Sequence, residues 1–172
     1  MKSFLVLLAL ISLAGPGLPT RQGAPQPVDE LQPMPALTLH DFAGKRMPVD
    51  AYKDTILVID FWATWCGPCI AEVPALNRLD EKYSARGVKV IGVTMASGEA
   101  KEVKPFIDRF KIKYTVLMGD DNQAYDFNII GFPTTYLVTR DRKVYRKFIG
   151  VTPGKSQQLE AEIQKLLQSN AG

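Results

Sequence analysis

Residues 58–69 read V-I-D-F-W-A-T-W-C-G-P-C and contain both cysteines of the chain, Cys66 and Cys69. The run from Thr55 to Phe61 is apolar and rich in β-branched residues apart from one acid, Asp60. Such a run predicts a strand that is covered on both faces of a sheet. Burying an ionised carboxylate there is costly. A buried acid this close to two thiols therefore indicates a site of chemistry.

The C-x-x-C spacing favours a redox pair over a structural bridge or a metal site. A disulfide between these cysteines closes a very short loop, so it restrains little of the unfolded chain. Structural zinc normally has four ligands, and His40 is the only other soft ligand in the sequence. We therefore expect neither a bound metal nor an organic cofactor.

Cys66 stands between the predicted strand and a predicted helix. Unpaired N–H groups and the positive end of the helix dipole stabilise a thiolate in the first turn, which lowers the thiol pKa. We expect Cys66 to be the exposed nucleophile, with Cys69 one turn further on as the resolving thiol. The helix is indicated by apolar residues at helical spacing after Cys69: Ile70, Val73, Leu76, Leu79 and Tyr83.

The neighbours of the cysteines suit this chemistry. Burial would raise the pKa of Asp60 toward neutrality, so it could exchange a proton with Cys69 directly or through a water. Alternatively, Asp60 caps a local turn or meets a lysine. Pro68 fits the first helical turn, where its missing N–H costs little. Gly67 would let the backbone of a partner approach closely.

The N-terminal residues resemble a targeting signal. Lys2 is followed by an apolar run, Phe4–Ala14, which ends in the small-x-small sequence Ser12-Leu13-Ala14. The run is too short to span a bilayer, so residues 1–14 are predicted to be a cleaved signal peptide, with an uncleaved membrane anchor as the alternative. The protein is then expected outside the cytoplasm, in the periplasm or secreted, where disulfides persist.

Three further segments follow the leader. The proline-rich residues 15–35 predict an extended, mobile linker, residues 36–168 one domain, and residues 169–172 a tail. A hydrophobic content of 46% can form a full core without disulfides. A formal net charge of +3 is too small to indicate binding to nucleic acid or to an anionic membrane.

The domain alternates predicted strands and helices, which indicates an α/β fold with a mixed central sheet flanked by helices on both faces. The alternating units predict mostly parallel pairing, and the last two strands predict an antiparallel hairpin. Expected strands cover 36–40, 46–49, 55–61, 88–94, 114–118, 134–139 and 143–149. Expected helices follow Cys69 up to Gly87, surround 103–110, lie within 120–130, and start at Thr152-Pro153 as N-cap and first residue.

D-F-W-A-T-W-C-G-P-C is similar to the active-site sequence of the thioredoxin superfamily. Pro74 matches the proline that kinks the family's active-site helix, and residues 131–134, G-F-P-T, resemble its cis-proline loop. The resemblance covers about residues 36–168 and implies a thioredoxin fold. The leader, an extra N-terminal β-hairpin, a βα insertion and the C-x-x-C-x-x-E pattern ending at Glu72 resemble the TlpA-like and ResA-like extracytoplasmic subgroup. Asp60 departs from that subgroup, in which many members carry Asn.

The resemblance also implies roles for residues around the cysteines. Pro133 would be cis and pack against the disulfide, although an ordinary trans proline is the alternative. A substrate segment would pair near Phe132 and Thr134, and Trp65 would belong to the docking surface. Glu72 would affect thiol acidity or partner choice, or would simply be a helix-surface glutamate favoured by the dipole.

These features predict an extracytoplasmic thiol-disulfide oxidoreductase. The Gly-Pro pair between the cysteines is that of thioredoxin, which favours a reductase of protein disulfides over an oxidant. The protein is expected to be a monomer. The resemblance implies a membrane electron donor of the DsbD/CcdA type, and cytochrome c maturation as one pathway the protein could serve. The alternative is a peroxiredoxin-like thiol peroxidase. Peroxidases of that kind normally carry Thr three residues before the reactive cysteine, where this chain has Ala63.

Overall fold

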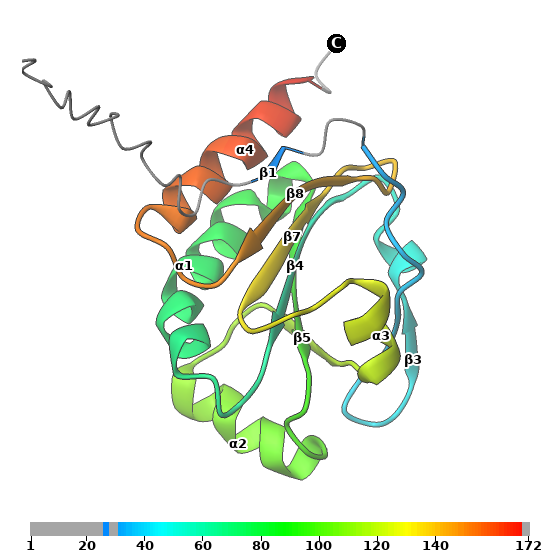
Figure 1. The fold of residues 1–172 in the computed structure, drawn as a ribbon, viewed down its shortest axis with the longest axis vertical. Coiled ribbons are helices and arrows are strands. Elements are labelled where there is room, and N and C mark those ends of the chain that lie inside the picture. Colours follow the sequence, from blue (N-terminus) through cyan, green and yellow to red (C-terminus); the bar gives the residue numbers. More distant parts are fainter. Residues whose placement is uncertain (1–25, 28–30, 170–172) are drawn as a thin grey trace, which may run out of the picture.

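The computed structural model describes residues 26–27 and 31–169 (Figure 1). The predicted signal peptide, most of the predicted linker before residue 31, and residues 170–172 of the predicted tail lie outside the described residues. Ser169, the first residue of that predicted tail, is the last residue of a helix instead.

The described strands form a mixed sheet in the order β1-β8-β7-β4-β5-β6-β2-β3. Parallel pairing in it is limited to β4–β5 and β5–β6, so the sheet is less parallel than predicted. The predicted N-terminal hairpin is confirmed as β2–β3, which extends the sheet beyond β6. The strands are β1 Gln26–Pro27, β2 Thr38–His40, β3 Arg46–Pro48, β4 Ile56–Trp62, β5 Val88–Thr94, β6 Thr115–Met118, β7 Thr134–Val138 and β8 Val144–Ile149.

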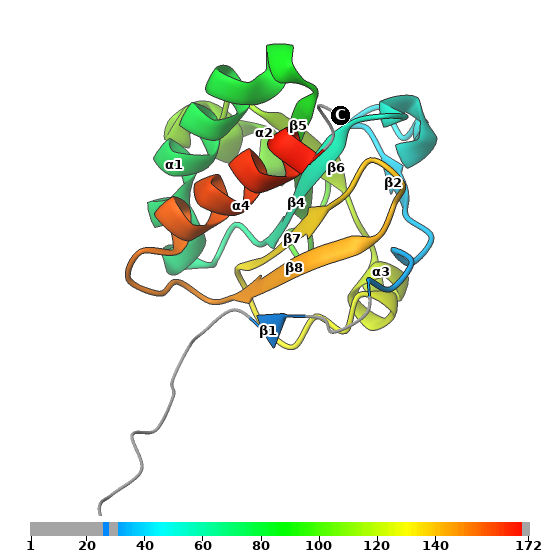
Figure 2. The ribbon, with the colours of Figure 1, turned by 90° about the horizontal axis from the view of Figure 1, so that it is seen from above.

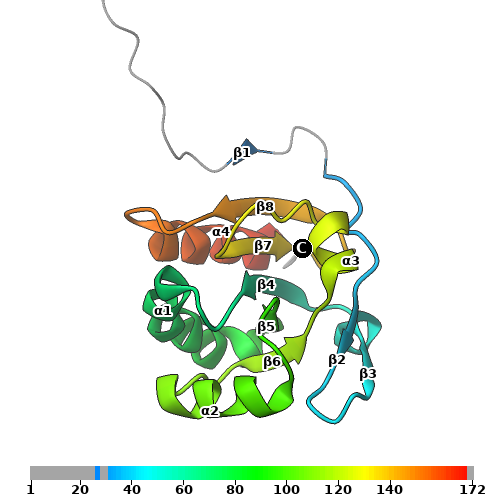
Figure 3. The same ribbon diagram turned by 60° about the horizontal axis from the view of Figure 1, so that its bottom comes forward.

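Helices cover both faces of the sheet (Figures 2 and 3). Three of them, α1 (Gly67–Tyr83), α2 (Ala100–Phe110) and α4 (Lys155–Ser169), pack on one face in a single apolar cluster. The other face carries α3 (Asp121–Asp126) and the short 3-10 helix η1 (Val49–Tyr52). In the part of the chain that the structure describes, no helix is long and apolar enough to cross a membrane.

The alternation of side chains along β4 places its acid. Ile56 and Val58 belong to the cluster under α1, whereas Leu57 and Ile59 belong to the cluster on the opposite face. Because successive strand residues point to opposite faces, Asp60 shares the face of Ile56 and Val58 and lies beneath α1. The fold therefore brings this acid to the helix that carries the cysteines.

Two helix ends involve glycines in the left-handed region. After α1, the 3-10 turn η2 (Ser84–Arg86) ends at Gly87, with φ 80°. The predicted start of the last helix at Thr152 is wrong. Gly154, with φ 79°, stands in a turn, and the N–H of Lys155 donates to the carbonyl of Thr152 at 3.1 Å. The helix begins only at Lys155.

The described part of the predicted linker is attached to the sheet. Strand β1 pairs with β8. Further along, the N–H of Val144 donates to the carbonyl of Gln32 at 2.8 Å, and the N–H of Met34 donates to the carbonyl of Arg142 at 2.7 Å. The sequence predicted a mobile linker because this segment has no periodic apolar residues. Backbone hydrogen bonds to the edge of a sheet can form without such a pattern.

Candidate active site

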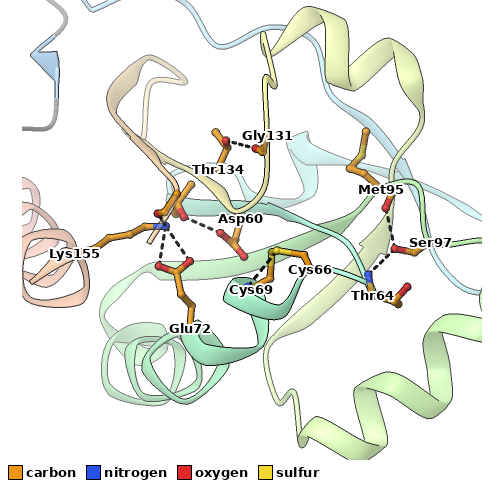
Figure 4. The surroundings of a disulfide bond; sticks show 12 residues. Asp60, Thr64, Cys66, Cys69, Glu72, Met95, Ser97, Gly131, Thr134 and Lys155 are labelled. Carbon is orange, nitrogen blue, oxygen red and sulfur yellow. Dashed lines mark hydrogen bonds and ion pairs between the residues drawn. A yellow bond between two sulfur atoms is a disulfide. The ribbon is translucent and has the colours of Figure 1, made fainter. Parts of the chain in front are cut away.

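The cysteines lie at the N-terminus of α1, as the sequence predicts (Figure 4). Cys66 is the N-cap and Pro68 stands in the first turn. Cys66 and Cys69 form a disulfide, with their Cα atoms 5.3 Å apart. The backbone N–H of Cys69 donates to Sγ of Cys66 at 3.2 Å. In the reduced protein the same N–H would favour a thiolate on Cys66.

Cys66 was predicted to be exposed, but it is buried in this disulfide form. Cys66 and Cys69 are each only 4% exposed, because both belong to the apolar cluster under α1. The exposed residues are those between them, Gly67 and Pro68. A Cβ atom on Gly67 would meet no other atom within 4 Å, so this position faces open space. A partner chain can approach the disulfide at this point.

The loop before α1 is held against the end of β5. The N–H of Thr64 donates to the Ser97 hydroxyl at 2.9 Å, and that hydroxyl donates to the carbonyl of Met95 at 2.8 Å (Figure 4). The indole N–H of Trp65 donates to the carbonyl of Ala96 at 2.9 Å, although the residue is 67% exposed. The Trp65 ring is thus presented at the surface in a fixed orientation.

The predicted cis-proline loop lies beside this tryptophan. The Phe132–Pro133 peptide bond is cis, as predicted, and Pro133 is buried. The half-buried ring of Phe132 contacts the Trp65 ring edge-on, with centroids 5.7 Å apart. Phe132 also packs against the cluster that contains both cysteines. Two aromatic rings from different loops therefore border the disulfide.

Thr134, which was expected to contact the substrate, does not lie at the surface. It is fully buried, and its hydroxyl donates to the carbonyl of Gly131 at 2.7 Å (Figure 4). Its backbone pairs in the sheet with Phe61 on one side and Ile149 on the other. Thr134 thus supports the shape of the loop, and Phe132 is the residue that remains accessible.

Asp60 lies beside the disulfide, 2% exposed (Figure 4). Its carboxylate accepts a hydrogen bond from the hydroxyl of Thr135 at 2.7 Å. Burial raises the pKa of Asp60 to about 7; the positive charge of Lys155 opposes this rise, and the negative charge of Glu72 adds to it. An acid with such a pKa can accept or release a proton at neutral pH.

Glu72 faces the protein interior, which excludes the solvated helix-surface alternative. Its side chain is 12% exposed, and both carboxylate oxygens lie 2.9 Å from Nζ of Lys155. Burial raises the pKa of Glu72 against the opposing charge of Lys155. Sequence reasoning missed Lys155. It stands four residues before Leu159, on the apolar stripe of the last helix, and a lysine at that position signals a buried partner.

The family follows from comparison with known proteins. The sequence pattern of the Redoxin family matches residues 30–163. The chain belongs to the Redoxin family. Thiol-disulfide oxidoreductase ResA of Bacillus cereus is 30% identical over 167 residues, which cover 95% of each chain. Thioredoxin-like protein YneN of Bacillus subtilis is 26% identical over 137 residues, 79% of this chain and 81% of the relative. This Redoxin-family chain is a ResA-like thiol-disulfide oxidoreductase.

Solved structures agree with the predicted thioredoxin fold. A crystal structure from Chlorobium tepidum, assigned as thiol:disulfide interchange protein DsbE, is 27% identical with a TM-score of 0.74. The match covers 81% of this chain and 98% of that one. A secreted thiol-disulfide isomerase from Corynebacterium glutamicum, 18% identical, shares the fold with a TM-score of 0.74 over 88% of this chain and 96% of its own.

Proposed function

We propose that this Redoxin-family protein is an extracytoplasmic reductase of protein disulfides that works through Cys66 and Cys69. The observation that carries the proposal is the disulfide at the start of α1 with the carboxyl of Asp60 buried beside it. The apolar leader sequence at residues 4–14 supports a location outside the cytoplasm.

In the first step, the thiolate of Cys66 attacks one sulfur of the partner's disulfide. A mixed disulfide forms between Cys66 and that sulfur, and the partner's second sulfur leaves as a thiolate that takes a proton from solvent. The N–H of Cys69, which donates to Sγ of Cys66 in the disulfide form, stabilises the attacking thiolate.

In the second step, Asp60 takes the proton of the Cys69 thiol. The resulting Cys69 thiolate attacks Cys66, the bond from Cys66 to the partner breaks, and the partner's sulfur leaves as a thiolate. The partner has then gained two electrons and the Cys66–Cys69 disulfide has formed. The Asp60 proton passes to solvent before the next cycle.

The surface around the disulfide suits an extended partner segment. Trp65 and Phe132 offer apolar ring faces, and the backbone beside the cis bond can pair with a strand of the partner. Gly67 leaves room for the partner's main chain. We assign substrate docking to these three residues and support of the loop to Pro133 and Thr134.

Repeated turnover requires the Cys66–Cys69 disulfide to be reduced again. In an oxidising compartment the electrons must come from the cytoplasm, and a membrane electron donor of the DsbD/CcdA type would supply them to a monomeric protein. The reduction of apocytochrome c during cytochrome c maturation is the pathway we propose. The ResA-like relatives and the Gly-Pro pair between the cysteines support a reductase.

A trapping experiment tests the proposal. Replacing Cys69 by Ser removes the resolving thiol, so the mixed disulfide on Cys66 should accumulate and identify the partner by mass. A Cys66→Ser protein is the matched control, and it should trap nothing and reduce no insulin. Trapping by the Cys66→Ser protein instead would overturn the order of the two thiols. Peroxide-dependent turnover faster than disulfide reduction would favour the thiol peroxidase alternative.

A further inference from the structure

Lys155 is a buried lysine that sequence reasoning left without a role. The side chain is 5% exposed, and its ammonium group has three oxygen acceptors within hydrogen-bond distance. Nζ lies 2.9 Å from each carboxylate oxygen of Glu72 and donates to the carbonyl of Gly150 at 3.0 Å. An ammonium group has three donors, so these contacts fix its position at the start of α4.

The ionisable groups around Asp60 belong to several elements of the fold. Lys155 belongs to α4, and Glu72 and Cys69 belong to α1 (Figure 4). Tyr114, directly before β6, also interacts electrostatically with Asp60. Among the described residues, Lys155 is the one cation with an effect on Asp60, and it favours the ionised carboxylate. Glu72 acts in the opposite direction and favours the protonated form of Asp60.

We propose that Lys155 is a positioning residue of the redox site: its ammonium group, held by Glu72 and Gly150, places a positive charge beside Asp60 and thereby keeps this carboxyl able to take the proton of Cys69 at neutral pH. The inference rests on the proposed function of Asp60 in the second step. The S–H bond of Cys69 breaks, the proton goes to the Asp60 carboxylate, and the electron pair left on sulfur forms the bond to Cys66. The bond from Cys66 to the partner's sulfur breaks, and that sulfur leaves as a thiolate.

The structure explains why an ion pair is needed at this place. Burial favours the protonated form of Asp60, and a protonated carboxyl cannot act as a base. A lone lysine at the same depth would itself be costly to bury. Glu72 offsets that cost by placing both carboxylate oxygens 2.9 Å from the ammonium group, and Figure 4 shows Lys155, Glu72 and Asp60 grouped beside the disulfide.

The test follows the titration of Asp60 by carbon NMR of reduced, aspartate-labelled protein. Glu72→Gln serves as the reference, because a second carboxylate would couple to the titration of Asp60. The Asp60 midpoint of this reference should lie below that of the natural protein. Adding Lys155→Met should raise the midpoint by about one pH unit or more, the shift expected for a charge at close range. Adding Lys155→Arg instead keeps the charge and should leave the reference midpoint in place.

Equal midpoints in the Glu72→Gln protein with and without Lys155→Met would overturn the inference and leave Lys155 a structural residue only. Circular dichroism checks the fold of each protein, and Lys155→Gln replaces Lys155→Met if the latter does not fold. The rate at which Cys69 resolves a mixed disulfide, measured against pH, should shift in parallel with the NMR midpoint.

The Asp60→Asn protein separates the two proposals. An unchanged resolving rate in Asp60→Asn protein would remove the proton role of Asp60, and with it this inference, whatever the NMR midpoint does. A slowed rate combined with an unmoved midpoint would retain the function proposed for Asp60 and remove the role of Lys155 alone.

Discussion

Replacing Asp60 by Asn should stabilise the oxidised protein, and more so as the pH rises. Burial raises the pKa of this carboxyl from 3.8 to about 7. Between these values the folded protein keeps a proton that the unfolded chain has released, so stability falls as the pH rises through this range. The rise of roughly three pH units corresponds to about 4 kcal/mol at most.

The assay is denaturant unfolding of the two oxidised proteins at about pH 4 and about pH 8.5, on either side of the Asp60 titration. Asn can still accept the hydrogen bond from Thr135, so the two proteins should be nearly equally stable at the lower pH. At the higher pH the Asn protein should be the more stable one. Asp108→Asn, on the exposed face of α2, is the matched control and should show no such change with pH. A stability difference that is the same at both pH values would refute the reasoning.

Three other predictions concern the packing, the docking surface and the nucleophile. Gly92→Ala should cost about 1–3 kcal/mol in denaturant unfolding, because the new Cβ would lie 2.8 Å from atoms of Trp62 and of Tyr114; an unchanged midpoint would show that both rings can move. Trp65→Ala should raise the KM for a protein disulfide several-fold while leaving thermal stability nearly unchanged, and an unaltered KM would remove Trp65 from the docking surface. Alkylation of the reduced protein by iodoacetamide against pH should give a Cys66 thiol pKa well below about 8.5, and an ordinary value would contradict the effect of the helix terminus.

The parts of the fold that sequence reasoning predicted are those that local patterns determine. The apolar run before the cysteines became β4, and the spacing of Val73, Leu76 and Leu79 became the buried face of α1. The position of Asp60 beneath the cysteines also followed, because a strand leads directly into the helix. These features depend on residues close together in the chain.

The parts that could not be predicted depend on contacts between distant segments. Lys155 meets Glu72 across 83 residues of sequence, and no local pattern relates them. The burial of Cys66 depends on how the helix packs on the sheet. The hydrogen bonds that pair residues 32–34 with the β7–β8 hairpin are made by backbone groups, whose pairing cannot be predicted from residue types.

The two tryptophans give the active site a natural optical signal. They are the only tryptophans in the sequence, and both stand within four residues of Cys66. Trp62 is buried and stacked on Phe106, with ring centroids 5.2 Å apart, whereas Trp65 faces solvent. All indole emission therefore originates at the redox centre, from one apolar and one aqueous environment. Fluorescence of the unlabelled protein can follow both disulfide opening and partner arrival in real time, and a Trp62→Phe protein would isolate the solvent-facing reporter.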